Sequence, residues 1–149
     1  MSLYRRILVP VDGSATSLRG LREALRIAKA EGARVWLLHV LDEFFALSDP
    51  ESARYSDLLI ASLKRGGERI LARAERLARS KGVKAHTLIP EIVGGPAAGE
   101  IVRQAKKLRA DLIVIGTHGR RGLKRLALGR DAEQVVRNSP APVLLLRGG

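Results

Sequence analysis

The feature that most constrains the fold of this chain is the alternation of short apolar runs with segments of helical periodicity. Five runs stand at residues 6–11, 35–41, 85–93, 112–115 and 143–146. Alternation of this kind is typical of repeated βα units around a parallel sheet. A continuous apolar run is typical of a strand that is buried on both faces. We therefore expect an α/β fold in which an open five-stranded parallel sheet carries helices on both faces.

Turn and capping residues bound the first helix. Asp12-Gly13-Ser14 turns the chain after the first run. A hydroxyl of Ser14, Thr16 or Ser17 then caps the helix by accepting a hydrogen bond from a backbone N–H group. Gly32 ends the helix. Its buried stripe is expected to be Leu18, Leu21, Leu25 and Ala28.

A long helical region after the second run contains two adjacent glycines. Its apolar stripe comprises Leu63, Ile70, Leu71, Ala74, Leu77 and Ala78. Its basic residues lie largely opposite and are typical of a solvated face: Lys64, Arg65, Arg69, Arg73, Arg76 and Arg79. Gly66 and Gly67 each cost about 1 kcal/mol in a helix interior, so we expect a kink or two shorter helices there.

Prolines mark the bounds of the later elements. Pro96 follows two glycines and suits the start of a helix over residues 97–108. A last helix is expected over residues 131–138. Pro140 and Pro142 then impose extended geometry before the final strand.

Composition bounds the class of protein. With 149 residues, 46% of them hydrophobic, the chain can bury one core, and we expect a single domain over residues 1–149. The sequence has no cysteine. This excludes a disulfide framework, a thiolate metal site and a cysteine nucleophile, and it favours the cytoplasm. No run reaches the roughly 20 apolar residues of a membrane span, and none resembles the core of a signal peptide.

The formal net charge of +12 is suited to anionic partners such as nucleotides, nucleic acid or phospholipid head groups, and charge alone does not choose among them. Aromatic residues make up only 3% of the chain. Because proteins that bind single-stranded nucleic acid stack bases on aromatic rings, we do not expect nucleic acid to be the partner.

The segment from Gly116 to Gly129 carries the strongest indication of chemistry. It links the fourth run to a helix start, and Gly116, Gly119 and Gly129 have a Gly-x2-Gly-x9-Gly spacing. Backbone N–H groups approach an anion closely where no side chain intervenes, so the segment is a candidate phosphate cradle. Ligands of open α/β sheets bind outside the carboxyl ends of strands, where the connections diverge. Asp12 joins the segment there if the first and fourth strands are central neighbours, as in the order 3-2-1-4-5.

Four motifs, in this order, resemble those of universal stress proteins. They are ILVPVDGS at residues 7–14, LHV at 38–40, DLIVIGTHG at 111–119 and PAPVL at 140–144. The resemblance covers essentially the whole chain. It implies a Rossmann-like fold of the adenine nucleotide alpha hydrolase-like kind, homodimers formed through the last strand, and membership of either an ATP-binding or a non-binding branch.

The resemblance also implies two groups of binding residues for ATP. Those at the adenine and ribose are Pro10, Val11, Asp12 and Val40. Those at the phosphates are Gly116, His118, Gly119 and Gly129. Asp12 is suited to hydrogen-bond ribose or to coordinate Mg²⁺ carried by the nucleotide, and its alternative role is to support the turn at Gly13.

The sequence departs from the ATP-binding pattern directly after Gly129. The pattern has Ser or Thr there, whereas this chain has Arg130. The guanidinium group of Arg130 either grips phosphate or fills the pocket. Asp131 would repel a phosphate about 4 Å away by a few kcal/mol. Basic residues in the same segment offset that repulsion: Arg120, Arg121, Lys124 and Arg125.

The remaining motifs give little support to catalysis. Ser14 lies in no Gly-x-Ser-x-Gly elbow, and neither a P-loop nor a Gly-x-Gly-x-x-Gly fingerprint is present. The three histidines lack ligand spacing. We interpret His39 and His86 as structural, and His118 as either a phosphate contact or a loop histidine.

Three functions follow as hypotheses. The first is a nucleotide-responsive stress protein in which ATP changes the surface offered to a partner. The second is a nucleotide-free dimeric interaction module. The third is a nucleotide hydrolase, slow at most, since no residue is identifiable that would position water against a γ-phosphate. Residues 143–146 form an apolar terminal strand, and such an edge needs a cover, so we expect a homodimer through it.

Overall fold

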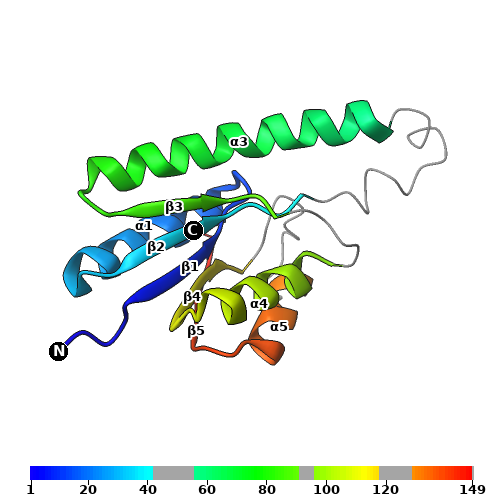
Figure 1. The fold of residues 1–149 in the computed structure, drawn as a ribbon. Coiled ribbons are helices and arrows are strands. Elements are labelled where there is room, and N and C mark those ends of the chain that lie inside the picture. The colour runs from blue at the N-terminus through cyan, green and yellow to red at the C-terminus, as the bar shows by residue number, and fades with distance from the viewer. Residues whose placement is uncertain (42–55, 91–95, 118–128, 149) are drawn as a thin grey trace.

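A single parallel sheet with flanking helices makes up the described part of the chain. The computed structural model describes residues 1–41, 56–90, 96–117 and 129–148. The strands are β1 (Arg6–Pro10), β2 (Arg34–Leu38), β3 (Ala85–Leu88), β4 (Leu112–Gly116) and β5 (Val143–Leu146). The helices are α1 (Ala15–Glu31), α3 (Ser56–Ser80), α4 (Ala97–Leu108) and α5 (Arg130–Asn138). The strand order is β3-β2-β1-β4-β5 (Figure 1), which confirms the predicted fold class and order.

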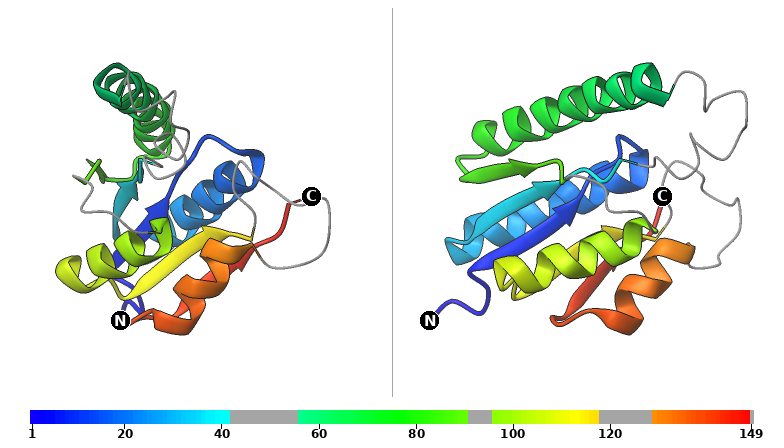
Figure 2. Two further views of the ribbon diagram at one scale, coloured as in Figure 1. Left: turned by 90° about the vertical axis from the view of Figure 1, so that its right-hand side faces the viewer. Right: turned by 45° about the vertical axis from the view of Figure 1, so that its right-hand side comes forward.

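Helices cover both faces of the sheet, with α1 and α3 on one face and α4 and α5 on the other (Figure 2). The side chains of β1 alternate between two buried clusters. Ile7 and Val9 join the cluster that includes α1 and α3, whereas Leu8 joins the cluster of α4 and α5. All three side chains are fully buried. Burial on both sides explains why the run has no polar alternation.

Three strands are shorter than predicted. β1 ends at Pro10 rather than at 11, β2 ends at Leu38 rather than at 41, and β3 ends at Leu88 rather than at 93. Pro10 and Leu88 are the register partners of Leu38, so β2 has no strand partner beyond that residue. Pro90 lacks the N–H group that a longer β3 would need. Residues 91–93 lie outside the described part.

Helix α3 is one 25-residue helix that runs through both glycines. The expectation of two shorter helices is therefore wrong, and Figure 1 shows no sharp bend at their position. Tertiary packing overrides the low helix propensity of glycine here. Leu71, Ala74 and Ala78 bury one stripe of the helix against the sheet, as predicted.

The caps of α1 agree with the sequence, and its stripe is narrower than predicted. Ser14 is the N-cap, and its side chain accepts a hydrogen bond from Ser17 N. Gly32 ends the helix in a left-handed conformation at φ 69°. Leu18 is 40% exposed and was wrongly assigned to the buried stripe, whereas the neighbouring Thr16 and Ser17 are buried.

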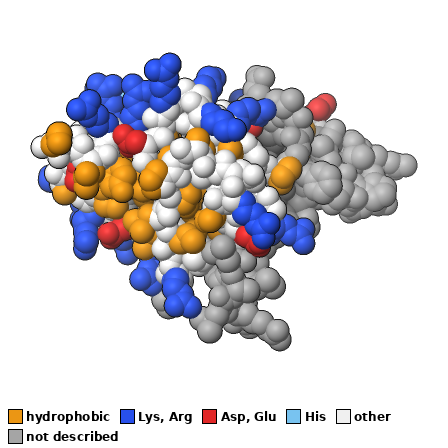
Figure 3. Space-filling view, turned by 90° about the horizontal axis from the view of Figure 1, so that it is seen from below, with side chains coloured by type: hydrophobic (Ala, Val, Ile, Leu, Met, Phe, Trp, Pro, Cys, Tyr) orange, Lys and Arg blue, Asp and Glu red, His pale blue; other side chains and the backbone are white. Residues whose placement is uncertain are grey.

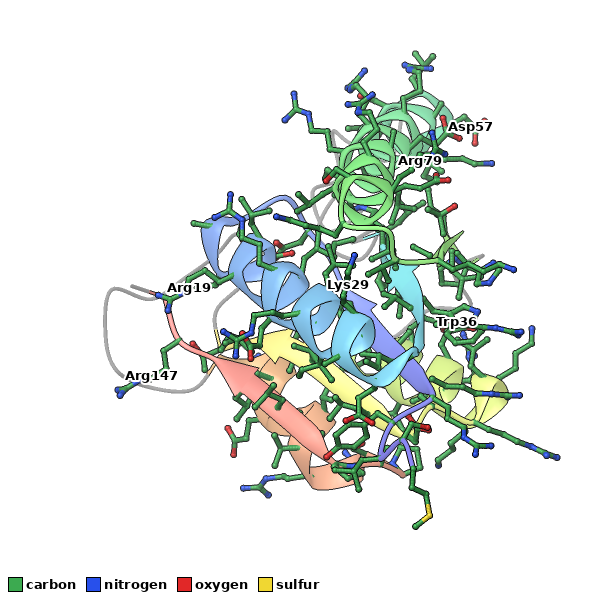
Figure 4. The ribbon with its side chains drawn as sticks, turned by 90° about the vertical axis from the view of Figure 1, so that its left-hand side faces the viewer. Arg19, Lys29, Trp36, Asp57, Arg79 and Arg147 are labelled. Carbon is green, nitrogen blue, oxygen red and sulfur yellow. The ribbon has the colours of Figure 1, made fainter. Side chains whose placement is uncertain are left out.

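Lys29 joins α1 to the end of α3. Its Nζ donates to the carbonyl of Lys81 at 2.9 Å, directly after α3 ends. Figure 4 shows Lys29 on the side of α1 that faces α3. A cation at a helix C-terminus also complements the partial negative charge of the helix dipole. The contact therefore holds the two helices of this face together.

Asp111 joins the amino ends of the two central strands. Its Oδ2 accepts from Arg5 N at 2.8 Å, and its Oδ1 accepts from Arg6 N at 3.0 Å. Asp111 N donates to Arg6 O at 2.9 Å. The carboxylate thus continues the pairing of β1 with β4 beyond the ladder itself.

Among the described helices, none is long and apolar enough to span a membrane.

Replacing Asp111 with Ala tests this link. We expect a loss of about 1 to 2 kcal/mol in the free energy of unfolding, because two backbone N–H groups lose a charged acceptor. Chemical denaturation measures the change. The exposed Glu68→Gln variant is the control and should shift stability by less than about 0.5 kcal/mol. If both variants change the free energy of unfolding equally, the hydrogen bonds of Asp111 add nothing to stability.

Candidate functional site

The turn after β1 holds Asp12 at the carboxyl edge of the sheet. Asp12 Oδ1 accepts a hydrogen bond of 2.8 Å from Ser14 N, and Asp12 N donates to Ser17 Oγ at 3.1 Å. Gly13 has a φ of 84°, which glycine adopts without a steric penalty. The first turn of α1 therefore fixes both the backbone and the carboxylate of Asp12, as an Asx turn does.

The carboxyl end of β4 meets the same turn of α1. A Cβ atom on Gly116 would lie 3.0 Å from Thr16 C and 3.1 Å from Thr16 O. Because those atoms belong to the backbone, no flexible side chain can move aside. Gly116 therefore allows β4 and α1 to approach closely, which is a packing reason for a glycine in addition to the predicted phosphate contact.

Asp12 and Gly116 flank the point where the connections of the sheet diverge. The register pairs of β1 with β4 are Ile7 with Leu112 and Leu8 with Ile113, whereas β1 stays paired with β2 up to Pro10. After β1 the chain enters α1 on one face, and α5 lies on the opposite face. In open α/β sheets this switch point is where ligands bind.

The start of α5 is tied to the end of β4. Gly129 N donates to Thr117 O at 2.7 Å. The helix begins at Arg130, one residue earlier than predicted, and both Arg130 and Asp131 are exposed. The N–H groups of a first helical turn carry partial positive charge and attract anions. Because Gly129 is hydrogen-bonded to Thr117, this helix start lies at the same edge of the sheet as Gly116.

Some of the residues expected to bind a nucleotide lie in the described part of the chain, and others lie outside it. Asp12, Gly116, Gly129 and Arg130 lie at the carboxyl edge, together with Pro10, Val11 and Val40. Val11 is buried, and Val40 is half-buried against the cluster under α4 and α5. His118 and Gly119 lie outside the described residues. So do the basic residues of that segment: Arg120, Arg121, Lys124 and Arg125.

His39 belongs to this region although the sequence suggested only a structural role. It follows β2, is 8% exposed, and places Nδ1 2.7 Å from Val11 O. The buried imidazole is consistent with the structural role expected for it. Its contact with the residue before Asp12 was missed. The LHV motif indicated only that His39 follows the strand next to β1, and it carried no sign of the contact with Val11.

The end of the chain also lies against the first turn of α1. A Cβ atom on Gly148 would lie 2.8 Å from Thr16 Cγ2. Figure 4 shows Arg147 and Arg19 at this end of α1, and both side chains belong to exposed residues. They add positive potential near the turn that carries Asp12.

The arrangement can supply hydrogen bonds and positive potential to an anionic ligand. Asp12 offers a carboxylate, which suits hydroxyl groups or a cation. The start of α5 offers backbone N–H donors and the side chain of Arg130. Among the described residues, no group of three or more His, Cys, Asp or Glu side chains is placed to hold a metal ion.

Comparison with known proteins covers nearly the whole chain. Residues 3–147 match the model of the universal stress protein family. Universal stress protein MJ0531 of Methanocaldococcus jannaschii is 39% identical over 146 residues, which is 98% of this chain and 84% of that protein.

Solved structures show the same fold. Universal stress protein UspA from Lactobacillus plantarum matches with a TM-score of 0.86 at 26% identity, over 99% of this chain and 100% of that one. A universal stress protein crystallised in complex with cAMP matches with a TM-score of 0.68 at 27% identity, over 98% of each chain. Family model, sequence relative and fold agree along the full length of the sheet. This chain belongs to the universal stress protein family.

Proposed function

We propose that this protein binds an adenine nucleotide at the carboxyl edge between β1 and β4, with ATP as the expected ligand, and that occupancy of the site regulates its interactions in the stress response. The carrying observation is the meeting of the Asp12 turn, Gly116 and the start of α5 at the switch point of the sheet. The similar universal stress protein in complex with cAMP supports an adenine nucleotide as ligand. A cytoplasmic location stays a prediction from the absence of cysteine.

Arg130 decides between the two interpretations of the altered glycine pattern. Its side chain belongs to an exposed residue at the first position of α5, so it does not fill a buried space. An exposed guanidinium beside helix N–H groups is placed to bind phosphate. This supports a gripping role and opposes a blocking role.

Substituting Arg130 with Ser tests that role. We expect ATP affinity to fall about tenfold, equivalent to about 1.4 kcal/mol, because one charge-assisted hydrogen bond to phosphate is lost. Isothermal titration calorimetry gives the affinity. Arg137→Ala is the matched control, since Arg137 lies at the other end of α5, pairs with Glu133 at 2.9 Å, and should leave affinity unchanged. A gain in affinity for Arg130→Ser would show that the arginine blocks the pocket.

Asp12 can act on ribose or on a nucleotide-bound Mg²⁺, and the two roles predict different results. Mg²⁺ in nucleotide sites is commonly held by one or two carboxylates together with phosphate oxygens, so the single carboxylate of Asp12 fits that role. Its carboxylate also accepts from hydroxyl groups. Asn at this position keeps the acceptor for Ser14 N and removes the charge.

We expect Asp12→Asn to lower ATP affinity at least tenfold. Calorimetry with ATP and 2′-deoxy-ATP, each with Mg²⁺ and with EDTA, separates the roles. If Asp12 binds ribose, the variant loses discrimination between the two nucleotides. If Asp12 binds the cation, the variant loses the dependence on Mg²⁺. Wild-type protein that binds neither nucleotide would refute the proposal and favour the nucleotide-free interaction module.

The second candidate function uses the edge of the sheet. β5 is an edge strand, and all four of its residues are only half-buried. Hydrophobic side chains gather on the face seen in Figure 3, which is the lower side of Figure 1 where β5 lies. Unpaired apolar edges of this kind pair with another copy of the chain. We propose homodimer formation through β5.

Val143→Pro tests whether the free edge of β5 forms the dimer, because it leaves the hydrogen bonds between β4 and β5 in place. Ile113 N donates to Pro142 O, and Thr117 N donates to Leu146 O. Hydrogen bonding alternates along a parallel strand, so the N–H group of Val143 points to the free edge. We expect a dimeric wild type and a monomeric variant in sedimentation velocity, with far-UV circular dichroism unchanged. A wild type that stays monomeric at high concentration would contradict this assignment.

A further inference from the structure

The peptide group between Val11 and Asp12 is held at both ends. Its C=O lies 2.7 Å from His39 Nδ1, and its N–H donates to Ser17 Oγ at 3.1 Å. A carbonyl only accepts hydrogen bonds, so His39 Nδ1 carries the hydrogen and donates it. Because the peptide is planar, these two bonds together fix the direction in which the chain enters Asp12. His39 therefore acts on the backbone of the site.

The other edge of the imidazole packs against α3. A Cβ atom on Gly67 would lie 2.5 Å from His39 Cδ2 and 3.0 Å from His39 Nε2. Atoms that close cannot coexist, so only glycine allows this approach. By contrast, a Cβ atom on Gly66 meets nothing within 4 Å. Gly67 thus packs against a buried side chain, whereas Gly66 has open space where a side chain would lie.

Gly67 is also where α3 enters the body of the protein. Among residues 57–67, it is the first buried residue along the helix, and Leu58 near the start is 71% exposed. Beyond it, Leu71, Ala74 and Ala78 are buried in the cluster that also holds Val11. A displacement of α3 at Gly67 is therefore transmitted directly to the ring of His39.

We propose that His39 is a positioning residue for the nucleotide site, and that α3 sets its position through Gly67. The inference rests on the proposed nucleotide site, and it names the element that controls that site. His39 contacts the backbone before Asp12 and acts on the ligand only through Asp12. A change in the position of α3 alters nucleotide affinity by rotating the peptide group between Val11 and Asp12. Binding energies are reciprocal, so nucleotide in turn stabilises the contact with α3.

The two glycines provide a matched pair for the experiment. Gly67→Ala pushes the His39 ring, whereas Gly66→Ala meets open space, and both gain the same helix propensity. We expect Gly67→Ala to lower the affinity for AMP at least tenfold by calorimetry and Gly66→Ala to keep it within twofold. Without any ligand, hydrogen exchange at the Asp12 amide should accelerate at least tenfold in Gly67→Ala only.

A variant at His39 distinguishes positioning from a general loss of structure. In His39→Asn the side-chain amide takes the place of Nδ1, and the atoms near Gly67 are removed. The combined variant Gly67→Ala with His39→Asn should therefore recover most of the affinity for AMP and the slow exchange of the Asp12 amide. His39→Leu in the same Gly67→Ala background keeps a buried apolar side chain but lacks the donor. It should therefore recover neither the affinity nor the slow exchange.

The outcomes separate this inference from the proposed function. If Gly67→Ala binds AMP as the wild type does and its Asp12 amide exchanges equally slowly, the positioning role of His39 is refuted while the nucleotide site stands. If the wild type binds neither AMP nor ATP but the exchange at Asp12 responds as expected, the link from α3 to Asp12 stands and the proposed ligand is refuted. If the combined variant Gly67→Ala with His39→Asn recovers neither the affinity for AMP nor the slow exchange of the Asp12 amide, the role of the Nδ1 donor is also refuted.

Discussion

The requirement that the central strands bury side chains on both faces organises this molecule. Leu8 and Ile113 belong to one cluster, whereas Ile7 and Val9 belong to the other. Both faces therefore need helices, and α1 and α5 lie on opposite faces. That divergence places the Asp12 turn and the start of α5 at a common edge. The candidate site thus follows from how the core is covered.

Glycines at this edge act mainly by allowing backbones to approach. Gly116 brings β4 against the first turn of α1, and Gly148 brings the end of the chain against the same turn. Gly67 brings α3 against His39. In each case an added Cβ atom would fall at 3.0 Å or less from its neighbour. Close packing of this kind makes the position of one element depend on that of the next.

In the part of the chain that the structure describes, most Lys and Arg residues lie on the helices. Arg79 and Arg137 each pair with a carboxylate one turn away on the same helix, and their side chains are 76% and 68% exposed. Exposed pairs of this kind contribute little to stability. A net positive charge of this size creates a field that attracts anions. Arg130 at the start of α5 is the described cation best placed to use that field at the site.

The sequence by itself determined the fold class and the end of the first helix at Gly32, and it offered Ser14 as one of three candidate caps, because periodicity and local hydrogen bonding depend on neighbours along the chain. The strand order was a prediction that the structure confirmed. The sequence also pointed to Asp12 and the glycines from Gly116 to Gly129 as candidate binding residues. Only the tertiary structure decided that α3 continues through Gly67 and that His39 reaches the peptide before Asp12. Both depend on contacts between residues 28 positions apart, from His39 to Val11 and from Gly67 to His39, and no local pattern encodes such contacts.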